Sequence, residues 1–87
     1  MKKYYVYIVE CADGSLYTGY TVNLKNRINE HNFGSLGAKY TRSRRPVRLV
    51  YQEEFENISL ALKREHAIKK YTRKKKLILI SRANTCN

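Results

Sequence analysis

The chain has little of what characterises disulfide-stapled, zinc-binding or membrane proteins. Its two cysteines, Cys11 and Cys86, lack CxxC spacing, which argues against a zinc site and a disulfide framework and favours reduced thiols. No apolar run approaches the roughly 20 residues that a membrane-spanning helix needs, and the first residues lack the apolar segment of a signal peptide. We therefore expect a cytoplasmic protein with no membrane partner.

Acidic residues are also scarce. Seven Asp and Glu stand against 18 Lys and Arg, which gives a formal net charge of +11. A field of this sign favours a polyanionic partner, so the expected partner is nucleic acid. The 87 residues are enough for one domain, 1–87, with one modest core.

The first half of the chain predicts a hairpin followed by a helix and a basic connector. Residues 4–10 and 15–22 are rich in Tyr, Val, Ile and Thr and flank Asp13-Gly14, a strong hairpin signal. Asn23 can cap a helix over residues 24–32, and Gly34 is expected to end it in the left-handed conformation. The connector GSLGAKYTRSRRP is expected to form a surface loop with one helical turn around residues 38–42.

The second half predicts one strand and two helices. The third strand spans residues 47–55, and helical spacing then runs from Ile58 to about Tyr71. Thr72 can cap a last helix that carries the apolar residues 77–80. This order predicts an α+β fold, in which helices flank a small, mostly antiparallel three-stranded sheet.

Two registers of the hairpin are possible, and they place its tyrosines differently. A two-residue loop at Asp13-Gly14 puts Tyr7 and Tyr17 on opposite faces, whereas a three-residue loop over residues 12–14 pairs Tyr7 with Gly19 and puts both rings on one face. We prefer the three-residue loop, because its bulged turn requires glycine at the third position. The two phenols can then meet one ligand, with Gly19 leaving an open floor beside Tyr7, while the opposite face forms the core.

Three polar side chains interrupt or border apolar helix stripes. His31 lies inside the stripe of the first helix, and Arg27 borders that stripe one turn away. Glu65 lies inside the apolar arc of the helix that starts at Ile58. A buried carboxylate needs a cation, a donor cluster, a metal or a proton. A structural histidine, and a salt bridge from Glu65 to Arg27 or a lysine, are the alternatives to functional roles.

These features together resemble the GIY-YIG nuclease family. The two family triplets correspond to Tyr5-Val6-Tyr7 and Tyr17-Thr18-Gly19, in which Tyr7, Tyr17 and Gly19 match the informative positions. Arg27-x-x-x-His31 and the Glu65 helix match as well, so the resemblance covers about residues 3–80. The segments CADGSLYTG and GAKYTRSRRPV resemble the small, stand-alone, single-domain bacterial branch of the family.

The resemblance implies hydrolysis of phosphodiester bonds in DNA or structured nucleic acid with one divalent cation, Mg²⁺ or a substitute such as Mn²⁺. By this resemblance Glu65 holds the metal, Tyr17 helps to deprotonate the attacking water, and Tyr7 positions water or phosphate. Arg27 neutralises charge on the scissile phosphate, and His31 assists proton transfer. Unlike several family members, the chain has no asparagine at residues 77–80.

The basic residues predict a surface that follows the nucleic-acid backbone, which carries little sequence information. DNA with branches, flaps or single-strand ends is therefore the expected substrate. An alternative is a nucleic-acid-binding module that retains the nuclease fold with weak or no turnover, and a third possibility is an RNA-associated or partner-binding accessory. The residues expected to contact nucleic acid are Gly19, Lys39, Tyr40, Arg42, Arg44, Arg45, Lys75 and Lys76.

Overall fold

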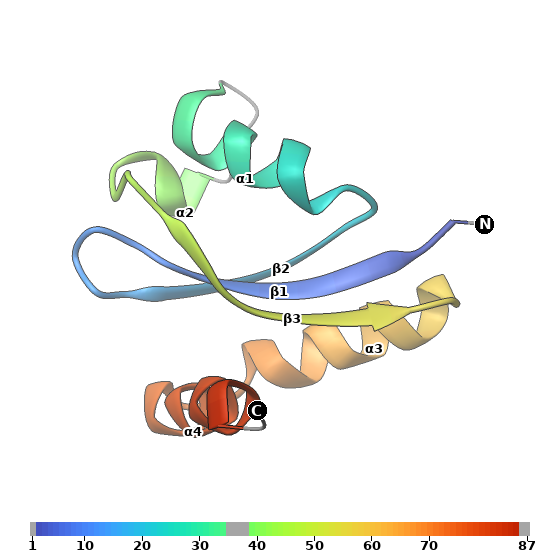
Figure 1. Cartoon of the computed structure of the whole chain (residues 1–87). Helices are drawn as coiled ribbons and strands as arrows, with labels where there is room; N and C mark the ends of the chain where they lie inside the picture. Colours follow the sequence, from blue (N-terminus) through green and yellow to red (C-terminus); the bar gives the residue numbers. More distant parts are fainter. Residues whose placement is uncertain (1, 35–38, 86–87) are drawn as a thin grey trace.

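A three-stranded antiparallel sheet forms the middle layer of the protein, with helices on both faces (Figure 1). The computed structural model describes residues 2–34 and 39–85, without the side chains of residues 39, 40, 84 and 85. The strand order is β2-β1-β3, so β1 is central and β2 is an edge strand. The predicted α+β fold is confirmed. The elements are β1 (Tyr4–Glu10), β2 (Leu16–Thr21), α1 (Leu24–Phe33), α2 (Lys39–Arg42), β3 (Arg48–Phe55), α3 (Ile58–Lys69) and α4 (Arg73–Thr85).

The hairpin adopts the three-residue loop. The Cys11 N–H donates to the Ser15 carbonyl oxygen at 2.8 Å, and Gly14 has a φ of 85°, the left-handed conformation that favours glycine. The register pairs Tyr7 with Gly19 and Val9 with Tyr17. The preferred register is therefore confirmed, and both tyrosines lie on one face of the sheet.

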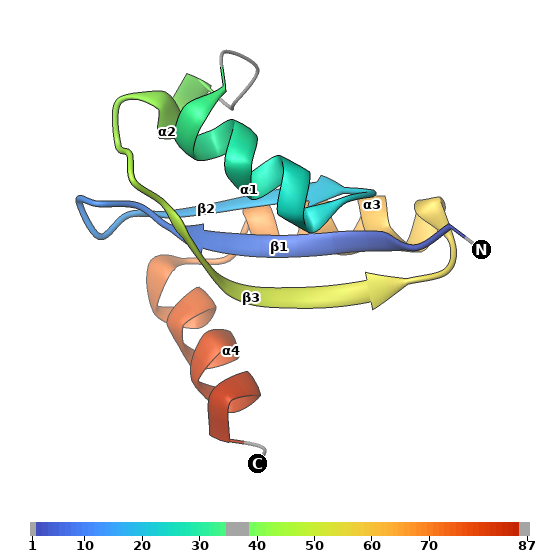
Figure 2. The ribbon, with the colours of Figure 1, turned by 45° about the horizontal axis from the view of Figure 1, so that its top comes forward.

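Each face of the sheet carries its own core. On the face covered by α3 and α4, Val6 and Ile8 pack with Ala61 and Ile68, as expected (Figures 1 and 2). The prediction that only this face is buried is wrong. The other face forms a second core of Tyr7, Val9, Cys11 and Val47, because α1 crosses over it with Leu24 and Ile28.

The helix ends confirm two predicted caps and correct one. The Asn23 side chain accepts the Asn26 N–H at 3.1 Å, and the Thr72 hydroxyl accepts the Lys75 N–H at 3.2 Å. Gly34 has a φ of −91°, so the predicted left-handed end of α1 is wrong. Instead, the guanidinium of Arg45 donates to the carbonyl oxygens at the end of α1, which are those of Glu30, His31 and Gly34.

This arrangement assigns Arg45 a structural role. A cation at the C-terminal end of a helix satisfies unpaired carbonyl groups and interacts favourably with the helix dipole. The Nε and Nη2 donors of the guanidinium are engaged by backbone oxygens. The contact of Arg45 with nucleic acid stays a prediction.

The last helix, α4, packs through one side and exposes the other. Leu79 and Ile80 join the core under the sheet, while Leu77 and Ile78 are partly exposed to solvent. Figure 2 shows α4 leaving the sheet at a steep angle to the strands. Within residues 2–34 and 39–85, no helix is long and apolar enough to cross a membrane.

Candidate active site

A chain of hydrogen bonds joins the central strand to α1 and α2. Tyr7 Oη lies 2.7 Å from His31 Nε2, and His31 Nδ1 lies 2.8 Å from Thr41 Oγ1. Arg27 Nε donates to Tyr7 Oη at 3.4 Å. In the assignment that gives every donor an acceptor, the Tyr7 hydroxyl donates to Nε2 and the imidazole proton lies on Nδ1, facing Thr41.

His31 is completely buried at the centre of this series of hydrogen bonds. The pKa of His31 is lowered to about 4, mainly by burial and in smaller part by the positive charges of Arg27 and Arg45, against the opposing effect of Glu30. The imidazole is therefore neutral at pH 7. Because no atom of His31 reaches solvent, its predicted role in proton transfer is restricted to exchange with the groups that it contacts, above all Tyr7.

The buried imidazole predicts a specific loss of stability in acid. The pKa of His31 is about 4 in the folded protein and 6.5 in a model compound. The unfolded chain therefore binds the proton first as the pH falls. We expect the free energy of unfolding to fall by up to about 3 kcal/mol between about pH 6.5 and pH 4 on this account. Urea unfolding at several pH values measures the loss.

The control is His31→Gln, which retains a hydrogen-bonding side chain that does not titrate. The variant should be less stable at pH 7 and should lose less stability in acid than the wild-type protein. Equal pH dependence of the two proteins would contradict a buried neutral imidazole.

Tyr7 is as buried as His31, with only 1% of its surface exposed. Burial raises the pKa of Tyr7 to about 12, in spite of the opposing effect of Arg27. A Cβ atom at Gly19 would lie 2.5 Å from Tyr7 Oη and 2.7 Å from Cζ, so the ring fills the space beside Gly19. The predicted open floor is therefore wrong, and the structure gives Gly19 a packing role, while its contact with nucleic acid stays a prediction.

Tyr17 is the more accessible phenol of the pair. It lies on the edge strand β2 and is half-buried, with its ring centroid 5.5 Å from that of His31 at an interplanar angle of 67°. His31 therefore contacts both tyrosine rings, since its centroid also lies 5.7 Å from that of Tyr7. Both phenols were expected to contact one ligand. Of the two, Tyr17 is accessible enough to do so, whereas the buried Tyr7 packs behind it.

Arg27 connects the buried, hydrogen-bonded residues to the solvent-exposed surface. In addition to its contact with Tyr7, its Nη1 lies 3.0 Å from Glu30 Oε1, and about a quarter of its side chain is exposed. These two contacts hold the guanidinium at the rim of the site. An arginine held in this way presents a positive charge and planar donors that suit a phosphate group.

Glu65 approaches the same site from α3. Burial is the main cause of the raised pKa of Tyr7, and the negative charge of Glu65 adds to it. The side chain of Glu65 is 18% exposed, and Lys69 Nζ lies 3.3 Å from its Oε2. The salt bridge to a lysine that the sequence left open is therefore present. The spacing of four residues was the signal that could have identified Lys69 as the partner.

The donor set restricts the kind of metal that the site can hold. The described parts of the chain contain no group of three or more His, Cys, Asp or Glu side chains that could enclose a metal ion. Mg²⁺ binds through one or two carboxylates and keeps several waters, with substrate phosphate completing its shell. One partly exposed carboxylate, Glu65, fits this requirement, and it would have to share its oxygens with Lys69.

The sequence matches a known protein family over most of its length. Residues 3–77 match the sequence model of the GIY-YIG catalytic domain. The chain belongs to the GIY-YIG family. The family is a nuclease superfamily whose substrates are in general nucleic acids, and its nucleases generally use divalent metal ions.

Similar GIY-YIG proteins are small and extend over nearly the same length. A UPF0213 protein of Staphylococcus saprophyticus is 62% identical over 81 residues, which cover 93% of this chain and 98% of the relative. The solution structure of a protein from E. faecalis has a TM-score of 0.68 and 43% identity, covering 100% of this chain and 92% of that one. The UPF0213 protein BH0048 from Bacillus halodurans has a TM-score of 0.59 and 47% identity, covering 91% and 83%.

The predicted basic surface of this GIY-YIG chain is only partly assembled. Arg42 is exposed, and Lys75 is exposed with its Nζ 4.1 Å from the centre of the Tyr71 ring. Arg44 Nε lies 3.1 Å from Asp13 Oδ2, which ties the connector to the hairpin loop. Lys76 is largely buried, and its contact with nucleic acid stays a prediction. The side chains of Lys39 and Tyr40 lie outside the described part.

Proposed function

We propose that this GIY-YIG protein is a metal-dependent endonuclease that hydrolyses phosphodiester bonds in branched or otherwise structured DNA. The observation that supports the proposal is the buried pair of Tyr7 and His31, with Arg27 bonded to Tyr7 and the Tyr17 ring against His31. The negative charge of Glu65 is close enough to affect the pKa of Tyr7. Tyr17, Arg27 and Glu65 come from β2, α1 and α3, and groups of these kinds can accept a proton, bind a phosphate and hold a cation.

Glu65 is the residue that would hold the metal. When bound, Mg²⁺ would lower the pKa of a coordinated water and offset charge on the oxygens of the phosphate. Lys69 keeps the carboxylate of Glu65 in place through its ion pair. Arg27 would bind the scissile phosphate and neutralise the negative charge that builds on it, since its donors remain charged throughout the reaction.

Tyr17 is the phenol placed to move a proton. In the proposed reaction Tyr17 acts as a phenolate that has released its own proton to solvent. The attacking water bonds to phosphorus, and its proton passes to this phenolate oxygen. The bond from phosphorus to the leaving oxygen breaks, and that oxygen takes a proton from solvent. Tyr7, with a pKa of about 12, stays protonated and orients Arg27 and His31.

Recognition by shape follows from the kind of contacts that the chain offers. Its charge of +11 attracts phosphates whatever the base sequence. Tyr17 is partly exposed on the edge strand β2. A nucleic-acid strand that is not held in a regular duplex can therefore approach it. We therefore expect flaps, branches and single-strand ends to be cut in preference to intact duplex.

A cleavage assay tests the proposal. Purified protein is incubated with flap, branched, nicked and intact duplex DNA, with Mg²⁺, with Mn²⁺ and with a chelator. We expect metal-dependent cleavage of the branched and flap substrates, and its loss in Arg27→Ala. Cleavage that survives in Arg27→Ala and Glu65→Ala would indicate contamination. Equal cleavage of intact duplex would contradict the selectivity for shape.

One observation favours the alternative function, a binding module without turnover. Leu77, Ile78, Leu79 and Ile80 occupy the region where several family members have an asparagine. Tight DNA binding without cleavage in either metal would support this alternative.

A further inference from the structure

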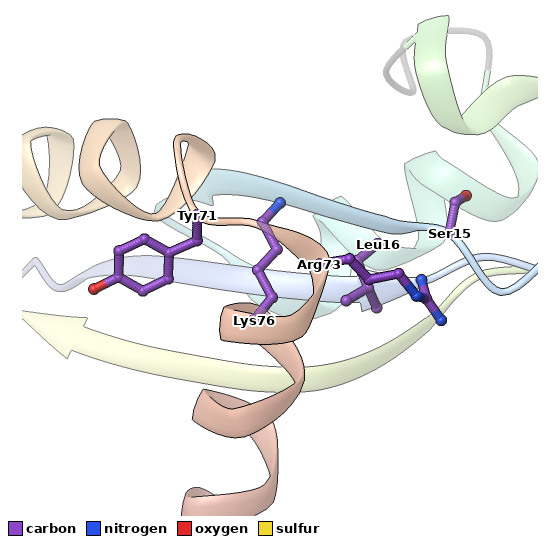
Figure 3. Close-up of a pocket in the computed structure, with 5 residues that line it drawn as sticks. All are labelled: Ser15, Leu16, Tyr71, Arg73 and Lys76. Carbon is purple, nitrogen blue, oxygen red and sulfur yellow. The ribbon is translucent and has the colours of Figure 1, made fainter.

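A cavity lies between the hairpin loop and the start of α4, on the side of the sheet away from Tyr7. Its volume is about 210 Å³, and it is lined by Ser15, Leu16, Tyr71, Arg73 and Lys76. Figure 3 shows these five side chains, with Lys76 between Tyr71 and Arg73 in this view. Leu16 immediately precedes Tyr17, whose side chain points to the opposite face of the same edge strand. The cavity and the candidate active site are therefore on the two sides of β2.

Lys76 is an unusual residue for the wall of such a cavity. Only 9% of its surface is exposed, and no hydrogen bond or ion pair to its ammonium group is found in the described part of the chain. Burial lowers the pKa of Lys76, and the positive charge of Lys69 lowers it further. Thr18 Oγ1, and not Lys76 Nζ, is the fully buried side-chain atom without a partner in the described residues, so the ammonium at the end of the largely buried Lys76 side chain reaches the cavity. An anion in the cavity can therefore pair with it.

Other groups add to the positive potential of the cavity. Its walls include Arg73 and Lys76 from the first turn of α4, where the helix dipole attracts anions. Arg73 lines the cavity and donates to the Gly14 carbonyl oxygen, which connects α4 to the hairpin loop. The nearby carboxylate of Asp13 is occupied by Ser15 and Arg44.

The position of the cavity connects it to the proposed active site. Lys76 is near enough to Lys69 for the charge of Lys69 to affect it, and Lys69 Nζ lies 3.3 Å from Glu65 Oε2. A strand crossing the edge of β2 could therefore place one phosphate at Arg27 and another in the cavity.

We propose that this cavity binds a phosphate group of the nucleic-acid strand, at a position separate from the phosphate that is cleaved. The inference rests on the proposed function for the identity of the strand. Lys76 supplies the charge, while Arg73 supplies further donors. Phosphate oxygens then provide the partner that the ammonium lacks within the protein.

The main test compares Lys76→Met with Lys74→Met, an exposed lysine on the same helix. Binding of a flap DNA and of a single strand is measured by fluorescence anisotropy in the presence of a chelator, so that cleavage cannot contribute. We expect about tenfold weaker binding for Lys76→Met, the loss of one charge-assisted contact, and a much smaller change for Lys74→Met. Equal losses in the two variants would overturn the proposal.

Stability provides a second readout, with the opposite sign. Methionine removes a positive charge that partial burial and the charge of Lys69 disfavour, so Lys76→Met should unfold at a higher temperature than the wild-type protein in the absence of ligand. Inorganic phosphate should stabilise the wild-type protein and have less effect on the variant. A phosphate response without any change in strand affinity would assign the cavity to free phosphate and contradict the proposal.

A measurement on the unaltered protein covers the case in which Lys76→Met fails to fold. Titration with a short single strand, followed by NMR of the lysine side chains, should raise the pKa of Lys76, because an anion stabilises the charged form. An unchanged pKa of Lys76 in the bound protein would overturn the proposal. If Lys76→Met selectively loses DNA binding and the wild-type protein does not cleave DNA, the phosphate site in the cavity is supported and the endonuclease proposal is rejected. If the wild-type protein cleaves DNA and Lys76→Met binds it as tightly as the wild type, the endonuclease proposal is supported and the phosphate site is rejected.

Discussion

Glu65→Gln is expected to abolish most cleavage while leaving the protein folded. The amide keeps the shape of the carboxylate and loses the charge that a divalent cation requires. We expect the cleavage rate to fall about a thousandfold, equivalent to about 4 kcal/mol of transition-state stabilisation. Single-turnover cleavage of a flap DNA with saturating protein measures this rate without a contribution from binding.

The matched control is Glu56→Gln, which makes the same change in net charge at an exposed position between β3 and α3. Its cleavage rate should remain within about twofold of the wild-type rate, a change of about 0.4 kcal/mol. Thermal unfolding should change little in either variant, because a partly exposed ion pair such as Glu65–Lys69 contributes little to stability. Unchanged cleavage by Glu65→Gln would exclude Glu65 as the metal ligand.

Gly19→Ala is expected to destabilise the protein by about 3 kcal/mol, near the upper end of the usual cost of overpacking. The added methyl group would lie 2.5 Å from Tyr7 Oη and 2.7 Å from Cζ. The Tyr7 ring has little room to move, since it is buried and its hydroxyl is hydrogen-bonded to His31. Urea unfolding at pH 7 measures the change.

Gly14→Ala separates this clash from a simple backbone effect. Gly14 has a φ of 85° and no atom within 4 Å of an added Cβ, so the substitution should cost only about 1 to 2 kcal/mol of backbone strain. In a double-mutant cycle, Tyr7→Leu should reduce the cost of Gly19→Ala and leave that of Gly14→Ala unchanged. Additive costs of Tyr7→Leu and Gly19→Ala would show that the ring does not cause the loss.

Local rules were sufficient for most of the fold. Asp13-Gly14 predicted the hairpin, and the preference of a bulged turn for glycine selected the register in which Tyr7 pairs with Gly19. Asn23 and Thr72 predicted the starts of two helices, because a cap acts on N–H groups two or three residues away. Such interactions depend on neighbours in the sequence, so the sequence alone reveals them.

The burial and the partners of the site residues could not be predicted from their neighbours in the sequence. Alternation placed Tyr7 and Tyr17 on one face, but it could not show that α1 covers Tyr7 and leaves Tyr17 half-buried. Arg45 was indistinguishable from its basic neighbours until its guanidinium was found at the end of α1. Lys76 was likewise one of several adjacent lysines, and the packing of α4 under the sheet buries it.

The sequence by itself determined the order of the elements, the hairpin register, the family and the set of polar residues that require partners. The tertiary structure decided which phenol is accessible, which basic residue caps a helix and that Lys76 is buried. The physical reason is that burial and pairing depend on residues far apart in the chain. His31 meets Tyr7 across 24 positions, and Arg73 meets Gly14 across 59.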